Sequence, residues 1–117
     1  MFSLFKVPLY YVQIKKNSFS IRSVKDAKTI VFDATTPFSS DRLLVAEFKV
    51  AEKLLTKALA SFSKSLLRPT LIMHPLELVG ETLSEVEEQI LRELALSAGA
   101  YKVKFWLGEP LDDHDLQ

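Results

Sequence analysis

Residues 83–110, LSEVEEQILRELALSAGAYKVKFWLGEP, decide the fold of this chain. Ser84 followed by Glu87 is typical of a helix capping box. Apolar residues then recur at helical spacing: Val86, Ile90, Leu91, Leu94, Ala95 and Ala98. Gly99 is the expected stop, because glycine accepts the left-handed conformation of a C-terminal cap. Apolar and polar side chains alternate after it, which predicts a last strand: Val103, Phe105 and Leu107 against Lys102, Lys104 and Trp106.

Upstream of this stretch, three short segments predict an antiparallel meander. Residues 9–14 and 18–24 are rich in β-branched and aromatic side chains and are separated by the polar turn Lys15-Lys16-Asn17. Residues 29–33, TIVFD, continue as a third strand. Residues 33–41 are turn-rich around Pro37 and predict a loop.

A second helix and a buried strand lie between the meander and the opening stretch. From Val50 onward, apolar residues at helical spacing predict a helix that ends before Arg68: Val50, Leu54, Ala58 and Phe62. Residues 43–48 fit either a short strand or the first turn of this helix. Residues 70–76, TLIMHPL, are apolar on both faces, as expected of a strand in the middle of a sheet.

The predicted order is strand, strand, strand, helix, strand, helix, strand. This order favours an α/β fold with a five-stranded mixed sheet, strand order 3-2-1-4-5 and both helices on one face, the RNase H-like arrangement. The second face then has no helix. We assign four residues to it as a candidate apolar interaction face: Tyr10, Tyr11, Met73 and Trp106. We therefore expect a protein partner there, with self-association as a homodimer the first choice.

Length and composition restrict the classes of function. The 117 residues predict one domain over residues 1–110, followed by a flexible acidic tail, residues 111–117, with nothing to pack against. Fifteen basic residues balance fifteen acidic ones, which argues against nucleic-acid binding. The absence of cysteine favours a cytoplasmic location. No apolar run approaches the roughly 20 residues of a membrane span, and the N-terminal segment is expected to belong to the mature protein.

Several segments resemble the bacterial actin-like ATPases of the MreB type. The opening stretch is similar to the family segment in which a glutamate-rich helix leads through Ser-Ala-Gly-Ala into a strand that ends in Glu-Pro, here Ser97 to Ala100 and Glu109-Pro110. Residues 43–59 are similar to the preceding helix of the family, and residues 68–75 take the place of its buried strand. The resemblance covers nearly the whole chain, but only the first subdomain of the family.

The resemblance implies ATP and Mg²⁺ binding, yet the phosphate-binding residues are missing. The family has a phosphate loop of Asp-x-Gly-Thr type between its first two strands, where this chain has Tyr11 to Asn17 without glycine or aspartate. The family's second phosphate loop and its adenosine-binding residues lie beyond the matching region. Glu109 corresponds to the glutamate that orients the attacking water in the family, and we interpret it as a relic. No cofactor and no catalytic residue are expected.

Three further groups of residues have a chemical and a structural interpretation. Asp112, Asp113, His114 and Asp115 have the residue types of a metal site, but a solvated acidic terminus is favoured. His74 beside Pro75 has no second histidine near it in sequence, which favours a structural role. Ser39-Ser40-Asp41 is typical of a turn before a helix.

The sequence therefore predicts a non-catalytic, actin-like single domain that acts in protein interaction or regulation, linked to cell shape or division. The alternative is half of a nucleotide-binding ATPase that completes its site with a second chain.

Overall fold

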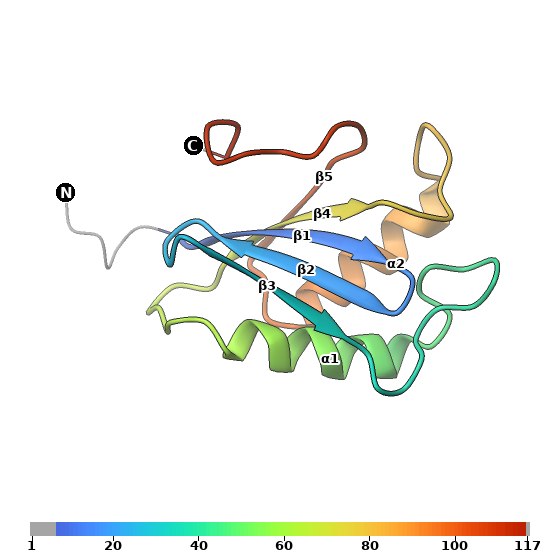
Figure 1. Cartoon of the computed structure of the whole chain (residues 1–117), viewed down its shortest axis with the longest axis horizontal. Coiled ribbons are helices and arrows are strands. Elements are labelled where there is room, and N and C mark those ends of the chain that lie inside the picture. The colour runs from blue at the N-terminus through green and yellow to red at the C-terminus, as the bar shows by residue number, and fades with distance from the viewer. Residues whose placement is uncertain (1–6, 117) are drawn as a thin grey trace.

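Seven elements follow one another in the order that the sequence predicts (Figure 1). They are β1 (Leu9–Lys15), β2 (Ser18–Ser23), β3 (Lys28–Asp33), α1 (Phe48–Ala60), β4 (Thr70–Pro75), α2 (Glu85–Ser97) and β5 (Lys102–Phe105). The computed structural model describes residues 7–116. Residues 1–6, which begin the N-terminal segment expected in the mature protein, and Gln117 of the acidic tail lie outside the described residues.

The five strands form one mixed sheet of order β3-β2-β1-β4-β5, which confirms the predicted order. β1 pairs with β2 in antiparallel and with β4 in parallel orientation, so that Tyr11 lies between Arg22 and Ile72. β2 and β3 are antiparallel, and β4 and β5 are parallel. β1 is therefore the central strand, and its side chains meet neighbours on both sides.

Both helices cover the same face of the sheet, as predicted (Figure 1). Alternate residues of the strands meet the apolar faces of α1 and α2 in one core. Fully buried members of this core include Val12, Ile14, Ile21, Leu55, Leu71 and Leu94. The molecule is a small α+β domain with one layer of helices on one layer of sheet.

The two helices differ in how well their ends were predicted. Ser84 accepts the backbone N–H of Glu87 and the Glu87 side chain accepts that of Ser84, which confirms the capping box of α2. Gly99 follows α2 with a φ of 113°, the left-handed conformation predicted for it. α1 ends at Ala60, before Arg68 as predicted, but Phe62 of the predicted apolar stripe lies outside it. The Ser61 hydroxyl donates a 2.6 Å hydrogen bond to the Ala58 carbonyl at this end.

Two further boundaries differ from the sequence prediction. α1 begins at Phe48, and most of residues 43–48 form neither a strand nor a helical turn. β5 ends at Phe105, so Leu107 lies outside it. The chain turns at Gly108, which has a φ of 129° and packs beside the Trp106 ring.

Candidate interaction face

The four residues predicted to form one interaction face do not share one face of the sheet. Tyr10 and Met73 are 6% and 0% exposed and belong to the core under the helices, so their assignment to the uncovered face was wrong. Tyr11 follows Tyr10 directly and points to the opposite face, because successive side chains of a strand alternate. Trp106 lies after β5 and is 40% exposed.

We call the sheet face opposite the helices the open face. Strand alternation and register place these residues on it: Tyr11, Gln13, Ser20, Arg22, Thr29, Val31, Ile72 and His74. Most of these residues are polar. Val31, which is 59% exposed, is the most exposed large aliphatic side chain among them. The prediction of an apolar face was therefore wrong. Tyr11 and Ile72 are the large nonpolar groups that β1 and β4 bring to this face, but Gln13 and His74 lie beside them, and β2 and β3 add hydroxyl and guanidinium groups.

The C-terminal segment crosses the open face. We call residues 106–116 the strap; Figure 1 shows it in red, with the sheet between it and α1. The backbone N–H of Leu111 donates a 3.0 Å hydrogen bond to the Tyr11 hydroxyl, and Leu116 is only 6% exposed. The prediction that this tail has nothing to pack against was therefore wrong for residues 111–116. Tyr11, assigned to the same face from its sequence, provides one of the packing partners.

Tyr11 and His74 form a buried hydrogen-bonded pair beneath the strap. The Tyr11 hydroxyl lies 2.6 Å from His74 Nδ1, and the two residues are 3% and 1% exposed. Their rings stack with centroids 5.8 Å apart. His74 makes a hydrogen bond with the Gly108 backbone that raises its pKa, as a donated ring N–H does, so we assign Nδ1 as the acceptor of the Tyr11 hydroxyl proton. His74 therefore carries its proton on Nε2.

The burial of this pair keeps both rings neutral. Burial lowers the pKa of His74 below its usual value, and a hydrogen bond with the Gly108 backbone acts in the opposite direction. Burial raises the pKa of Tyr11, against the Leu111 N–H, which favours the ionised oxygen. The predicted structural role of His74 agrees with this arrangement, because the ring positions Tyr11, which holds the strap.

An ion pair provides the second attachment of the strap. Arg22 Nε lies 3.0 Å from Asp113 Oδ1, and Arg22 Nη2 lies 2.7 Å from Asp113 Oδ2. This two-pronged geometry is the strongest form of an arginine–carboxylate contact. The hydrogen bond from Arg22 lowers the pKa of Asp113, burial opposes this shift, and the positive charge of Arg22 adds to the lowering. The side chains of Arg22 and Asp113 are 25% and 54% exposed, so solvent and salt weaken the pair.

Asp112 and Asp115 stabilise the turn at the end of the strap. The N–H of Asp112 donates to Asp115 Oδ2 and the N–H of Asp115 donates to Asp112 Oδ1, both at 2.9 Å. Leu116 N–H donates to the Asp112 carbonyl at 3.1 Å. Within residues 7–116, no three His, Asp or Glu side chains are grouped as metal ligands. The aspartates thus fold the end of the strap so that Leu116 is buried.

Glu109, the candidate relic of a catalytic glutamate, is exposed at the start of the strap. Its backbone carbonyl accepts a 2.8 Å hydrogen bond from Trp106 Nε1. This bond closes the turn at Gly108 and directs the chain from β5 toward the open face. The position of Glu109 is therefore set by its backbone, and the interpretation of its carboxylate as a relic stays a prediction.

The β1–β2 turn, where the resembling family binds phosphate, is occupied by contacts within the chain. Lys16 N–H donates to Glu77 Oε1 at 2.8 Å, and Asn17 N–H donates to the Ser39 hydroxyl at 3.0 Å. Asn17 has a φ of 58°, and its side-chain oxygen accepts the backbone N–H groups of Phe38 and Ser39, each at 2.8 Å. Asn17 therefore fixes the conformation of this turn. This role was not predicted, although asparagine in a two-residue hairpin turn is typical of a residue with positive φ.

Three cavities border the strap. One of about 580 Å³ is lined by Gln13, Lys15, Ser18, Ser20, Val31 and Pro110 among others. The second, of about 310 Å³, lies between Arg22 and the strap and shares Gln13 and Ser20 with the first. A third, of about 350 Å³, lies beside His74 and is lined by Val79, Glu81 and Gly108. The strap therefore leaves space on the open face beside it.

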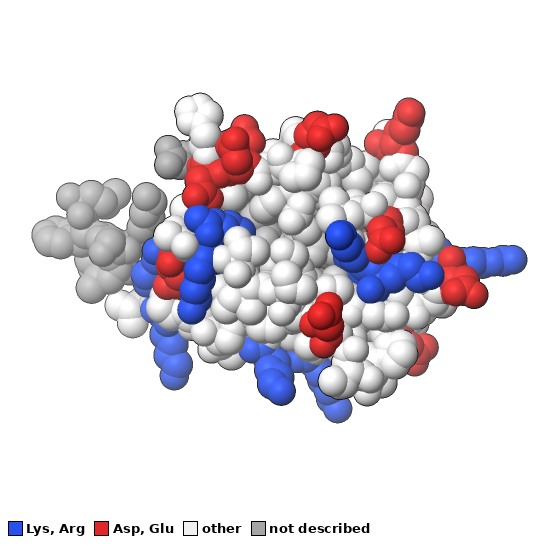
Figure 2. Space-filling model, in the orientation of Figure 1, with Lys and Arg blue, Asp and Glu red and all other residues white. Residues whose placement is uncertain are grey.

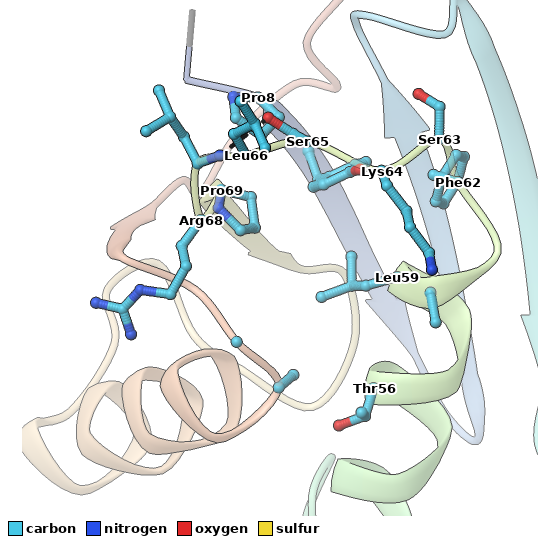
Figure 3. A pocket seen from close by; sticks show the side chains of 15 residues that line it. Pro8, Thr56, Leu59, Phe62, Ser63, Lys64, Ser65, Leu66, Arg68 and Pro69 are labelled. Carbon is cyan, nitrogen blue, oxygen red and sulfur yellow. Dashed lines mark hydrogen bonds between the residues drawn. The ribbon is translucent and has the colours of Figure 1, made fainter. Parts of the chain in front are cut away.

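A separate apolar groove of about 420 Å³ lies between the C-terminal ends of the two helices (Figure 3). Leu59 points into it, and Pro8 and Pro69 border it. Arg68 points away from the groove and lies 5.8 Å from the centre of the Tyr101 ring. None of its lining residues belongs to the open face.

The charges are also distributed unevenly over the surface. Figure 2 shows acidic side chains gathered along the upper side of the molecule and several basic ones along the lower side. On α1, Lys49, Lys53 and Lys57 are exposed. Within the part of the chain that the structure describes, no helix is both long enough and apolar enough to cross a bilayer.

The fold and the strap define a small α+β domain whose helix-free sheet face is partly closed by its own C-terminal segment. No protein-family model matches the chain. The chain is 35% identical over 103 residues to the uncharacterized protein YjaA of Escherichia coli (strain K12), and the match covers 81% of this chain and 78% of YjaA. The chain belongs to the YjaA family.

Proposed function

We propose that this protein is a non-catalytic interaction domain that binds a protein partner at the open face. The single observation that carries the proposal is that, among residues 7–116, no helix covers this face, which holds a short strap bordered by cavities of about 580 and 310 Å³. Residues 111–116 of the strap are fixed by one hydrogen bond to Tyr11, one partly exposed ion pair and the burial of Leu116. A surface of this kind accepts a second chain at small cost in internal contacts.

The contacts of the β1–β2 turn support the non-catalytic part of the proposal. A phosphate group bound there would need free backbone N–H groups. The Lys16 N–H is held by the Glu77 carboxylate, and the Asn17 N–H by the Ser39 hydroxyl. The Glu77 carboxylate and the Ser39 hydroxyl thus occupy the N–H groups that a phosphate would need. No contact of the described residues favours the alternative of half an ATPase.

The strand order and the position of both helices support a relation to RNase H-like domains and to the first subdomain of the MreB-type proteins. We accordingly propose cell shape or division as the process in which the partner acts. Self-association at the open face is the simplest form of the proposal, and sedimentation velocity over a range of protein concentrations tests it.

Photo-crosslinking in cells tests the interaction directly. A photoreactive amino acid at Val31, which is 59% exposed on the open face, is expected to form an adduct with a specific protein. The same amino acid at the exposed Lys57 of α1 is the matched control and is expected to form none. Equal adducts at both positions, or none at Val31 across growth conditions, would contradict the proposal.

Thermal unfolding with ATP and Mg²⁺ tests the non-catalytic part. A ligand at about 100 times its dissociation constant adds about 2.7 kcal/mol of stability, which a melting curve resolves easily. We expect no shift, either in the native chain or in the Glu109→Ala variant. A shift that Glu109→Ala abolishes would support the ATPase alternative instead.

A further inference from the structure

The strap shows what chemistry the open face recognises. It lies on the face as a segment without helix or strand, and it presents one backbone N–H to the Tyr11 hydroxyl and, two residues later, one carboxylate to Arg22. Leu111 provides its backbone N–H and Asp113 its carboxylate, so the recognised pattern is a backbone donor followed at the second position by an acid. The strap therefore occupies the open face as a bound peptide ligand would, although the strap and the face belong to one chain.

The charge of the open face also restricts the chemistry of a protein partner. Arg22 is the charged residue of the open face that the strap contacts, and Asp113 neutralises it in the closed arrangement. When the strap leaves, a partner that covers Arg22 without offering an acid would bury an unpaired cation, which is costly. Hydroxyl and amide groups of Gln13, Ser20 and Thr29 line the cavity beside Arg22 and can bind the backbone of an added segment.

We propose that the strap is an internal ligand that competes with an acidic, extended segment of a protein partner for Tyr11 and Arg22. This inference rests on the proposed function and deepens it, because it names the chemistry of the partner and the element that regulates access. The tether favours the strap, since a segment joined to its site by a short linker has an effective concentration in the millimolar range. A partner segment therefore binds well only when the strap is loosened or when the partner makes additional contacts.

The experiment uses the full chain and a fluorescent peptide with the sequence of residues 109–116, EPLDDHDL. In the Asp113→Arg chain, Arg22 repels the strap, and the free peptide is expected to bind at least about tenfold tighter than to the native chain. In the Arg22→Asp, Asp113→Arg double variant the exchanged pair closes the strap again, so the affinity for the peptide is expected to return to the native level or below.

Two further variants test whether the binding depends on the charge pair and on the N–H donor to Tyr11. The Arg22→Asp chain is expected to bind a peptide with Asp113→Arg and to reject the native peptide. The Leu111→Pro chain removes the N–H donor to Tyr11 without a change of charge, and it is expected to bind the native peptide more tightly than the native chain does. It also replaces Asp113→Arg if that variant does not fold, as judged by circular dichroism.

The outcomes separate this inference from the proposed function. Equal peptide affinity for the native, Asp113→Arg and Leu111→Pro chains would overturn the competition, even if adducts form at Val31. Tighter binding to the opened chains, reversed by the charge exchange, would support the competition even if no cellular adduct is found, in which case the proposed function alone fails.

Discussion

The Tyr11 hydroxyl lies 2.6 Å from His74 Nδ1, and its oxygen accepts the Leu111 N–H at 3.0 Å. One hydroxyl group thus connects β1, β4 and the strap. The Tyr11 and His74 side chains are almost fully buried, so each group of this connection depends on the other two for its hydrogen bond.

Tyr11→Phe tests this connection. The variant leaves the buried His74 Nδ1 and the Leu111 N–H without partners, and we expect a loss of about 1–3 kcal/mol in the free energy of unfolding. Urea unfolding measures it. Tyr101→Phe is the matched control, because Tyr101 is 64% exposed, and it is expected to change the stability by less than about 0.5 kcal/mol. Equal effects of the two variants would show that the hydroxyl of Tyr11 does not stabilise the fold.

Stability is expected to depend on pH through His74. Burial lowers the pKa of His74 below the ordinary value of 6.5, so the unfolded chain binds a proton at a pH at which the folded chain does not. The contribution of His74 is therefore complete above about pH 6.5 and is lost as the pH falls from there through the folded pKa.

Urea unfolding between pH 7.5 and pH 5 measures this loss. The His74→Gln variant keeps a hydrogen-bond acceptor for Tyr11 but has no group that titrates, so the decrease is expected to be smaller in it. The same decrease in both chains would assign the pH dependence to other groups.

The placement of Met73 in the core gives a prediction about packing. Met73 is fully buried, and Met73→Ala is expected to cost about 2–5 kcal/mol because it removes a core side chain and leaves a cavity. Val31 on the open face is the control, and Val31→Ala is expected to cost less than about 1 kcal/mol. Chemical denaturation of both variants measures the difference. A small effect at Met73 would place this side chain at an interaction surface after all.

Asn17 is expected to be the most sensitive residue of the β1–β2 turn. Asn17→Ala removes the acceptor of the Phe38 and Ser39 N–H groups and places an alanine at a φ of 58°. Asn17→Gly removes the same acceptor without the backbone strain, so it is expected to be less destabilising by about 1 kcal/mol. Melting curves of the two variants provide the comparison. If alanine is tolerated as well as glycine, the positive φ is not a source of strain.

The order of the strands and helices could be predicted from the sequence because periodic apolar residues and local caps determine it. Ser84 with Glu87 and the glycine at position 99 are short-range signals, and both were confirmed. The end of α1 at Ala60, before Phe62 of its predicted stripe, could not be predicted in the same way, because the residues after it make a contact with a distant part of the chain. Ser63 donates its N–H and its hydroxyl to Asp26, in the turn between β2 and β3, and residues 61–69 follow that contact instead of the helix.

The strap was missed for a similar reason. Residues 111–116 are mostly polar and carry no periodic pattern, so nothing local predicts a packed segment. Its two attachments join residues that are 100 and 91 positions apart, Leu111 with Tyr11 and Asp113 with Arg22. Tyr10 and Met73 were placed on the wrong face because the apolar residues of central strands occur on both sides, and the registers that separate them become visible only in the assembled sheet.

The most direct test of the central claim combines the open face with its strap. Photo-crosslinking at Val31 is compared in cells that produce the native chain and the Asp113→Arg chain, with Lys57 as the control position. An interaction domain closed by its own strap predicts a specific protein adduct at Val31 that increases in the Asp113→Arg chain, and none at Lys57. An unchanged or absent adduct at Val31 in the opened chain would contradict it.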